Sequence, residues 1–223
     1  MRDVPENGET RIRSTLLSGK PRDESLEVSL VIAAAIGIVS AWAWRDPAIF
    51  RILSASTDRI LSGREYWRLL TTVAVHGDLQ HLAVNMVYLV YFGYLLYGYF
   101  GFWSYPFAML VLASLTTLLS LLTYRDSIVL IGASGLVYLM AGFWLVMYGL
   151  IERTISPRKR LLRIIGITLI VLVPSTLRPE VSYRTHAIGA ALGSLAAIAW
   201  FASRKEQIRA AELIEPEPLD MDE

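Results

Sequence analysis

Four polar residues in this 223-residue chain are of types that could do chemistry, and each lies in a strongly hydrophobic segment. They are Ser134, the pair His81 and Asn85, and His186. A serine hydroxyl activated by an imidazole is a nucleophile, and histidine and asparagine side chains can donate hydrogen bonds to a developing oxyanion. Polar groups at membrane depth need partners or a function. The set therefore contains the parts of a serine hydrolase.

His81 and Asn85 are four residues apart, so a helix would carry them on one face, one turn from each other. Such a pair presents two hydrogen-bond donors in the same direction. The alternative is ordinary hydrogen bonding between helices, which is common for His and Asn in membranes. His76, five residues before His81, is expected to be structural or in contact with water.

Ser134 lies in a run of small residues, with Gly132 and Gly135 on either side. Small residues allow a neighbouring helix to approach closely, and they leave backbone N–H groups open to a ligand. The hydrophobic run around Ser134 predicts that it lies roughly seven residues inside a helix, about 10 Å below the helix start. Packing alone is the alternative explanation of such a run.

His186 opens a segment in which Gly189 and Gly193 form a G-x-x-x-G row, a pattern typical of close contact between helices. His186 projects from nearly the same face, because three residues separate it from Gly189. If this helix packs against the one that carries Ser134, the two side chains can form a dyad with the imidazole as general base and then acid. No acidic residue is placed to orient His186. Tyr138, one turn after Ser134, can pack on the imidazole ring instead.

The composition indicates a membrane protein and excludes several classes of site. The chain is 54% hydrophobic and 18% charged, with a mean hydropathy of +0.46, which is too apolar for an ordinary soluble domain. It has no cysteine, which excludes disulfides, thiolate zinc sites and cysteine nucleophiles. No block of basic residues suggests nucleic acid. His76 and His81 lack an evident third metal ligand, so we expect no metal and no cofactor.

The hydrophobic segments predict an all-α membrane protein, a bundle of six transmembrane helices with an interfacial first loop. A spanning helix needs about 20 mostly apolar residues. The first loop, residues 45–67, is interrupted by charges and cannot span. The expected spans are residues 28–44, 79–100, 102–124, 128–151, 161–177 and 185–202.

The distribution of basic residues predicts the orientation. With six spans, 13 of the 21 Lys and Arg residues fall on the side of the two termini, which favours cytoplasmic termini. Residues 1–25 and 204–223 are then cytoplasmic tails. The second tail is acidic and contains Pro216 and Pro218, so its last ~15 residues are expected to be disordered.

The motifs occur in an order that resembles the rhomboid family of intramembrane serine proteases, over a range from about Glu65 to Gly193. Each motif alone is weak, whereas four in order on the expected helices are specific. They are Trp67-Arg68 in the first loop, His81-x-x-x-Asn85, Gly132-x-Ser134-Gly135, and His186-x-x-Gly189-x-x-x-Gly193.

The resemblance implies a role for each matching residue. Ser134 would be the nucleophile and His186 the general base, without a third acidic member. His81, Asn85 and the backbone N–H of Ser134 would form the oxyanion site, and Tyr138 would support the catalytic histidine. Trp67-Arg68 would be structural.

The resemblance also implies the substrate and the place of action. Residues 26–203 would be a six-helix protease domain in a prokaryotic cell membrane. It would cut transmembrane segments of other membrane proteins, with the lipid bilayer as its surroundings. The scissile part of such a segment must unwind, because a hydrogen-bonded helix hides its carbonyl groups. The oligomeric state is left open.

Two other classes of function remain at this point. A small transporter or channel would use the buried His and Asn side chains as an ion path. The lack of inverted-repeat symmetry and of intramembrane carboxylates disfavours it. The second alternative is a non-catalytic rhomboid-like protein that binds other membrane proteins.

Overall fold

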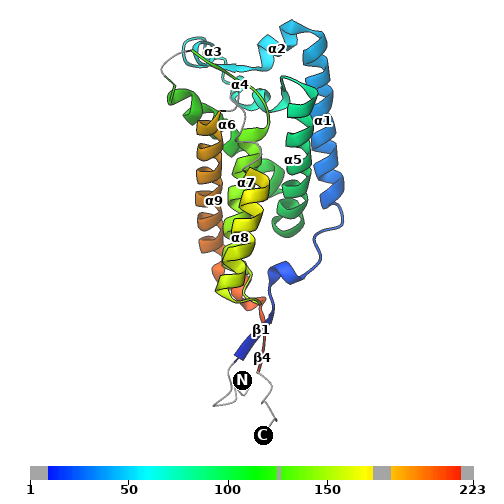
Figure 1. The fold of residues 1–223 in the computed structure, drawn as a ribbon, viewed down its shortest axis with the longest axis vertical. Helices are drawn as coiled ribbons and strands as arrows, with labels where there is room; N and C mark the ends of the chain where they lie inside the picture. Colours follow the sequence, from blue (N-terminus) through cyan, green and yellow to red (C-terminus); the bar gives the residue numbers. More distant parts are fainter. Residues whose placement is uncertain (1–9, 125–126, 173–181, 217–223) are drawn as a thin grey trace.

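The computed structural model describes residues 10–124, 127–172 and 182–216 and shows an elongated helical bundle with both ends of the chain on one side (Figure 1). We call that side the terminal end and the opposite side the loop end. Five helical stretches are long and apolar enough to cross a bilayer. They are α1 (Ser25–Arg45), α5 (Leu79–Phe100), the π-helical turn η3 (Trp103–Ala108) continued by α6 (Met109–Leu122), α7 (Ser134–Ile151) and α9 (Tyr183–Ala210).

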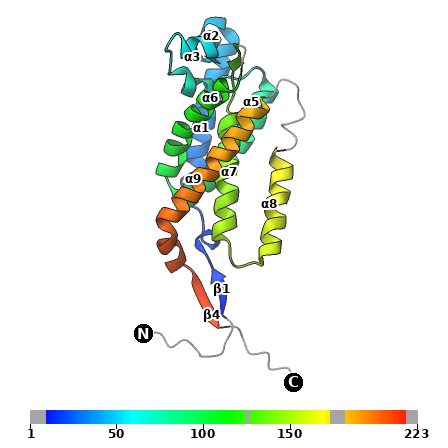
Figure 2. The ribbon, with the colours of Figure 1, turned by 90° about the vertical axis from the view of Figure 1, so that its left-hand side faces the viewer.

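A sixth helix, α8 (Pro157–Leu172), lies beside α7 (Figure 2). The hydroxyl of Tyr88 in α5 donates to the carbonyl oxygen of Ile170 in α8 (3.4 Å). It covers part of the span expected at residues 161–177, whose remainder lies outside the described residues. Within the described part of the chain, α8 is not among the helices that qualify as spans by length and hydropathy. The sixth span therefore stays a prediction.

Short elements build the loop end. They are α2 (Pro47–Leu53), β2 (Ala55–Ser56), α3 (Thr57–Leu61), α4 (Arg68–Thr71) and the 3-10 turn η2 (Thr72–Ala74), and β2 pairs antiparallel with β3 (Val129–Leu130). The buried Arg68 side chain holds this loop together. Its guanidinium donates to the carbonyl oxygens of Ser54 (2.9 Å) and Arg51 and pairs with the carboxylate of Glu65. This hydrogen bond lowers the pKa of Glu65. Trp67 is half exposed.

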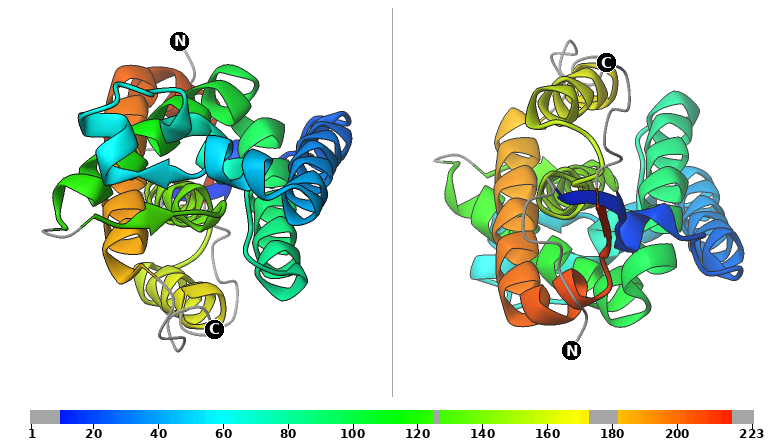
Figure 3. Two further views of the ribbon diagram at one scale, coloured as in Figure 1. Left: turned by 90° about the horizontal axis from the view of Figure 1, so that it is seen from above. Right: turned by 90° about the horizontal axis from the view of Figure 1, so that it is seen from below.

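Helix α7 is the centre of the bundle. Of the 18 residues in the most apolar stretch of α7, 67% are buried, whereas the same share is 22–39% in the other four spans. Viewed along the bundle, α7 lies in the middle and α1 lies at the edge, packed on α5 (Figure 3). A site built on α7 is therefore held from several sides.

The contact between α7 and α9 is close because glycines line it. A Cβ atom added at Gly193 would overlap the carbonyl oxygen of Leu139, and one at Gly189 would lie 2.5 Å from the carbonyl oxygen of Gly135. On the α7 side, a Cβ at Gly142 would overlap the carbonyl oxygen of Ala190. The G-x-x-x-G row in the sequence thus corresponds to a backbone-to-backbone helix contact.

The expectation that residues 128–151 form one helix was wrong at its start. Helix α7 begins at Ser134, and the residues before it form the short strand β3 followed by irregular backbone. Gly132 has a φ of +98°, a conformation outside the right-handed helix, and its N–H donates to the carbonyl oxygen of Thr72 (3.0 Å). Ser134 is consequently the first helical residue and does not lie two turns inside a span.

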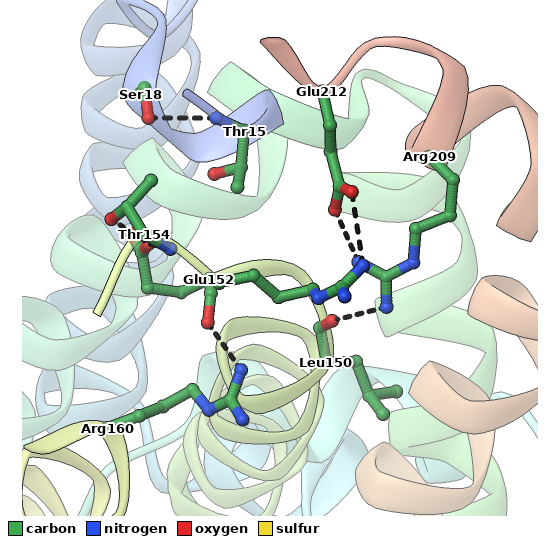
Figure 4. A network of polar contacts seen from close by, with 9 residues as sticks. Thr15, Ser18, Leu150, Glu152, Thr154, Arg160, Arg209 and Glu212 are labelled. Atoms are coloured by element: carbon green, nitrogen blue, oxygen red, sulfur yellow. Dashed lines mark hydrogen bonds and ion pairs between the residues drawn. The ribbon is translucent and has the colours of Figure 1, made fainter. Parts of the chain in front are cut away.

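The expectation of a disordered C-terminal tail was also wrong for its described part. Helix α9 continues to Ala210, and β4 (Leu213–Pro216) pairs antiparallel with β1 (Thr10–Ser14), which is followed by the 3-10 turn η1 (Leu16–Ser18). Glu212 explains the order, because its buried carboxylate accepts hydrogen bonds from Arg153 (3.1 Å) and Arg209 (2.5 Å) (Figure 4). Pro218 lies outside the described residues.

The α7–α9 contact yields a prediction of stability. Gly193→Ala should lower the free energy of unfolding by about 1–3 kcal/mol, because the added methyl group forces the two backbones apart. Thermal denaturation of the detergent-solubilised protein measures the change. Gly37→Ala in α1 is the matched control, since nothing lies within 4 Å of its added methyl group. Equal effects of the two substitutions would contradict the role of this contact.

Candidate active site

A cavity of about 390 Å³ opens where the loop-end halves of α5, α7 and α9 meet. The four residues with chemical potential, Ser134, His186, His81 and Asn85, all line it. They come from three different helices, so the fold and not the local sequence brings them together. Gly132 and Gly135 line the same cavity beside the serine.

Ser134 lies at the start of α7, where the helix dipole and the backbone act together. The first N–H groups of a helix have no acceptor within the helix, and the helix start carries a partial positive charge. Gly135 follows Ser134 in the first turn. The serine hydroxyl therefore stands beside backbone donors suited to a negatively charged oxygen.

His186 lies in the first turn of α9 and is only 4% exposed. Its ring stacks on Tyr138, with the ring centroids 3.9 Å apart and the planes inclined by 13°. Neither Nδ1 nor Nε2 has a hydrogen-bond partner among the described residues. The hydrogen bond to Ser134 that a resting dyad would show is thus not formed, although both side chains face one cavity. Catalytic hydrogen bonds are often long before substrate binds.

The start of α9 is fixed by a small polar cluster. Ser182 caps the helix by accepting a hydrogen bond from the backbone N–H of Thr185 (3.2 Å). The Ser182 hydroxyl also bonds the hydroxyl of Tyr124 (2.7 Å). The guanidinium of Arg184 lies over the Tyr124 ring, 4.6 Å from its centroid. These contacts set the position of the turn that carries His186.

His81 and Asn85 line the side of the cavity formed by α5. Asp78 caps this helix by accepting from the backbone N–H of His81 (2.7 Å), and the Asn85 amide donates to the carbonyl oxygen of His81 (2.9 Å). A Cβ atom at Gly132 would lie 2.7 Å from Nε2 of His81, so only glycine fits there. The imidazole is therefore close to the backbone that leads into Ser134.

Of the two expectations for His76, the structural role is confirmed and contact with water is wrong, because the side chain is fully buried and hydrogen-bonded. Its partners were not predicted. Its Nε2 accepts a hydrogen bond from the backbone N–H of Ala133 (3.1 Å), so in the neutral ring the proton is on Nδ1. Nδ1 then donates to the Ser40 hydroxyl (3.0 Å), which donates to the carbonyl oxygen of Ala74 (2.8 Å). Through these bonds α1 holds the residue that precedes Ser134. A lone serine in the first span gives no sequence signal for this pairing.

The described residues contain no group of three His, Cys, Asp or Glu side chains that could hold a metal ion.

The Rhomboid domain family matches residues 63–203, more than half of the chain. The chain belongs to the rhomboid family. The matched range contains the four sequence motifs and the whole lining of the cavity, and with the five apolar helices it makes this rhomboid an integral membrane protein. A comparison with curated proteins finds no match.

His76 yields a pH-dependent prediction for this rhomboid. Burial, with a smaller effect of nearby His81, lowers the pKa of His76 to about 3, whereas an unfolded chain has a histidine pKa near 6.5. Between these values the unfolded chain binds a proton that the folded protein does not. The free energy of unfolding should therefore fall as the pH falls below about 6.5, by up to about 1.4 kcal/mol per pH unit.

Thermal denaturation at several pH values between about 7 and 5 tests this dependence. His76→Gln cannot titrate but retains a donor and an acceptor, so its stability should vary less with pH. Ser40→Ala is the control, because it removes a partner of His76 and keeps the titrating ring. Identical slopes for His76→Gln and the unmodified protein would rule out His76 as the source.

Proposed function

We propose that this rhomboid is an intramembrane serine endopeptidase that cleaves transmembrane segments of other membrane proteins. The observation that carries the proposal is that Ser134, His186, His81 and Asn85 all line one cavity. The imidazole of His186 stacks on Tyr138, and neither of its nitrogens has a hydrogen-bond partner among the described residues. A serine and a histidine facing one cavity are the minimal parts of acyl transfer.

In the proposed reaction Ser134 Oγ attacks the scissile carbonyl carbon, and His186 removes the hydroxyl proton. The peptide nitrogen then leaves with the proton that His186 returns to it, and an acyl-enzyme remains on Ser134. Water, activated by the same imidazole, hydrolyses the ester and restores the serine. Tyr138 takes the orienting role that an acidic residue has in a triad, because the stacked ring restricts rotation of the imidazole.

The oxyanion of the tetrahedral intermediate would be stabilised from two directions. The backbone N–H of Ser134 belongs to the first turn of α7, where the helix dipole favours negative charge. The side chains of His81 and Asn85 supply donors from α5. Preorganised donors of this kind act where charge develops in the transition state.

The proposal includes a placement in the membrane. Residues 26–203 form the protease domain, α8 completes a six-span bundle, and both termini lie in the cytoplasm of a prokaryotic cell. The excess of basic residues at the terminal end supports this orientation. Since the cavity lies at the opposite end, cleavage would occur near the non-cytoplasmic face. Part of the substrate helix must unwind to expose a carbonyl group there.

Removal of the nucleophile tests the proposal directly. Ser134→Ala should abolish both the cleavage of a model transmembrane substrate and the labelling of the purified protein by a fluorophosphonate. Ser114→Ala in α6 is the control, because its hydroxyl bonds only its own helix, at the carbonyl oxygen of Leu110. Persistent labelling of Ser134→Ala would reject the assigned nucleophile. If the unmodified protein cleaves no membrane substrate and supports ion-dependent flux in vesicles, the transporter is favoured instead.

Asn85→Ala tests the oxyanion site. It should lower kcat by about 10²-fold and leave KM nearly unchanged, since the amide acts mainly on the transition state. Gln207→Ala is the control, because it removes an exposed amide from the terminal end of α9, outside the lining of the cavity. A change confined to KM would show that Asn85 only binds substrate.

A further inference from the structure

A second hollow lies on the opposite half of the molecule, between α7, α8 and α9. It is a groove of about 360 Å³, a size within the range of ligand pockets, and it shares no lining residue with the catalytic cavity. Its lining is almost entirely apolar, and its two hydroxyl groups bond their own helices. The lining includes Gly142 and Gly149 of α7, Ile164 and Thr168 of α8, and Ala190 and Ser194 of α9.

Helix α8 lies close to α7 at the terminal end of the groove. There, a Cβ atom at Gly149 would lie 3.3 Å from the Cδ1 atom of Ile164. Farther along α8, nothing lies within 4 Å of a Cβ atom at Gly166, whereas Ile167 packs against the core of the bundle. The lining of α7 extends from Gly142 to Leu150, which corresponds to about 12 Å of helix. One leaflet of a bilayer has a hydrocarbon depth of about 15 Å, so the groove matches a single leaflet.

Basic side chains lie at the terminal end of the groove. Arg160 is one turn before Ile164 on α8, and its guanidinium donates to the carbonyl oxygen of Glu152 (2.6 Å). Arg163 donates to the Tyr148 hydroxyl (3.3 Å), beside the lining of α7. Two arginine side chains of α8 thus bond it to the end of α7.

Two further cations at this end are available to a ligand. Arg158 and Lys159 are exposed in the first turn of α8, and among the described residues their side chains have no hydrogen-bond or ion-pair partner. The start of α8 also carries the partial positive charge of a helix N-terminus. An apolar groove one leaflet deep therefore ends at a cluster of positive charge.

We propose that this groove binds one acyl chain of an anionic glycerophospholipid from the leaflet at the terminal end, with its phosphate at the first turn of α8. The charge cluster selects an anionic headgroup over a zwitterionic one, as basic pockets between transmembrane helices do. A substrate helix is about 10–12 Å wide with its side chains and needs more room than this groove offers, whereas a hydrocarbon chain is far thinner. The lipid fills the space that α8 leaves open and links α8 to α7 and α9.

Photo-crosslinking in vesicles tests the proposal without reference to protease activity. The protein is reconstituted in phosphatidylcholine that contains a trace of lipid with a diazirine in its acyl chain, carrying either a phosphatidylglycerol or a phosphatidylcholine headgroup. Crosslinks from the phosphatidylglycerol probe should concentrate on residues 142–150, 164–168 and 190–194, and the phosphatidylcholine probe should label them several-fold less. Equal labelling by the two probes would overturn the headgroup selection, and labels spread over the lipid-facing surface would overturn the groove.

Two charge-neutralising variants separate a local site from a general surface effect. Arg158→Gln/Lys159→Gln should reduce phosphatidylglycerol labelling of the groove about tenfold, since each basic residue near the surface contributes to anionic lipid binding. Arg204→Gln/Lys205→Gln removes the same charge from exposed positions on α9 and should leave the labelling unchanged. If both variants lost labelling to the same extent, the labelling would reflect general electrostatic attraction of anionic lipid to the protein surface, and the local site would be rejected.

Filling the groove gives an independent test of the acyl chain. Ser194→Leu should remove groove labelling while the protein keeps its elution volume and melting temperature. Unchanged labelling in a folded Ser194→Leu protein would reject the groove as the binding place. Competition of a transmembrane substrate peptide with the probe would assign the groove to substrate instead of lipid.

Discussion

The backbone contact between α7 and α9 is the interaction on which the rest of this structure depends. At Gly193, Gly189 and Gly142 the two helices leave no space for a Cβ atom, so the helix axes must run close together. This closeness lets the imidazole of His186 stack at 3.9 Å on Tyr138, one turn beyond Ser134. Lipid provides no hydrophobic driving force between helices, so packing of small residues has to supply the attraction. The same residues that hold the bundle together thereby place Ser134 and His186 on one cavity.

The second constraint is that irregular backbone inside a membrane protein must find hydrogen-bond partners within the protein. The segment before Ser134 is irregular, and neighbouring residues bond several of its backbone groups. Gly132 donates to the carbonyl oxygen of Thr72, and Ala133 donates to the ring of His76. The hydroxyl of Thr72 donates in turn to the carbonyl oxygen of Leu130. The segment that leads into Ser134 is thus held by residues of the loop end.

Sequence patterns predicted the parts of this fold that depend on local composition. The span at residues 79–100 matches α5, because an uninterrupted apolar run is bounded by the capping Asp78 and the turn at Gly101. The start of α7 was predicted wrongly, since hydropathy cannot distinguish apolar extended residues from apolar helix. The decisive feature is the positive φ of Gly132, at a position where the ring of His81, from another segment, leaves no space for a Cβ atom. The β1–β4 pairing was missed for a similar reason: the carboxylate of Glu212 is bonded by Arg153 from a distant loop.

In the candidate site, too, the sequence predicted the residue types but not the contacts that depend on the fold. The residue types and their order pointed to Ser134, His81, Asn85 and His186, but the sequence could not show how each histidine is bonded. His76 has both ring nitrogens in hydrogen bonds, which locks one tautomer and makes the ring a structural connection. In the described structure His186 has neither nitrogen bonded, although it is as deeply buried. A buried polar group without a hydrogen bond lowers the free energy of unfolding by about 1–3 kcal/mol. Native structures retain such groups mainly where they have a functional role, such as catalysis. Both ring nitrogens of His76 are used in structural hydrogen bonds, whereas those of His186, which lines the same cavity as Ser134, are not bonded among the described residues. This difference is the strongest structural reason to propose His186 as the catalytic histidine.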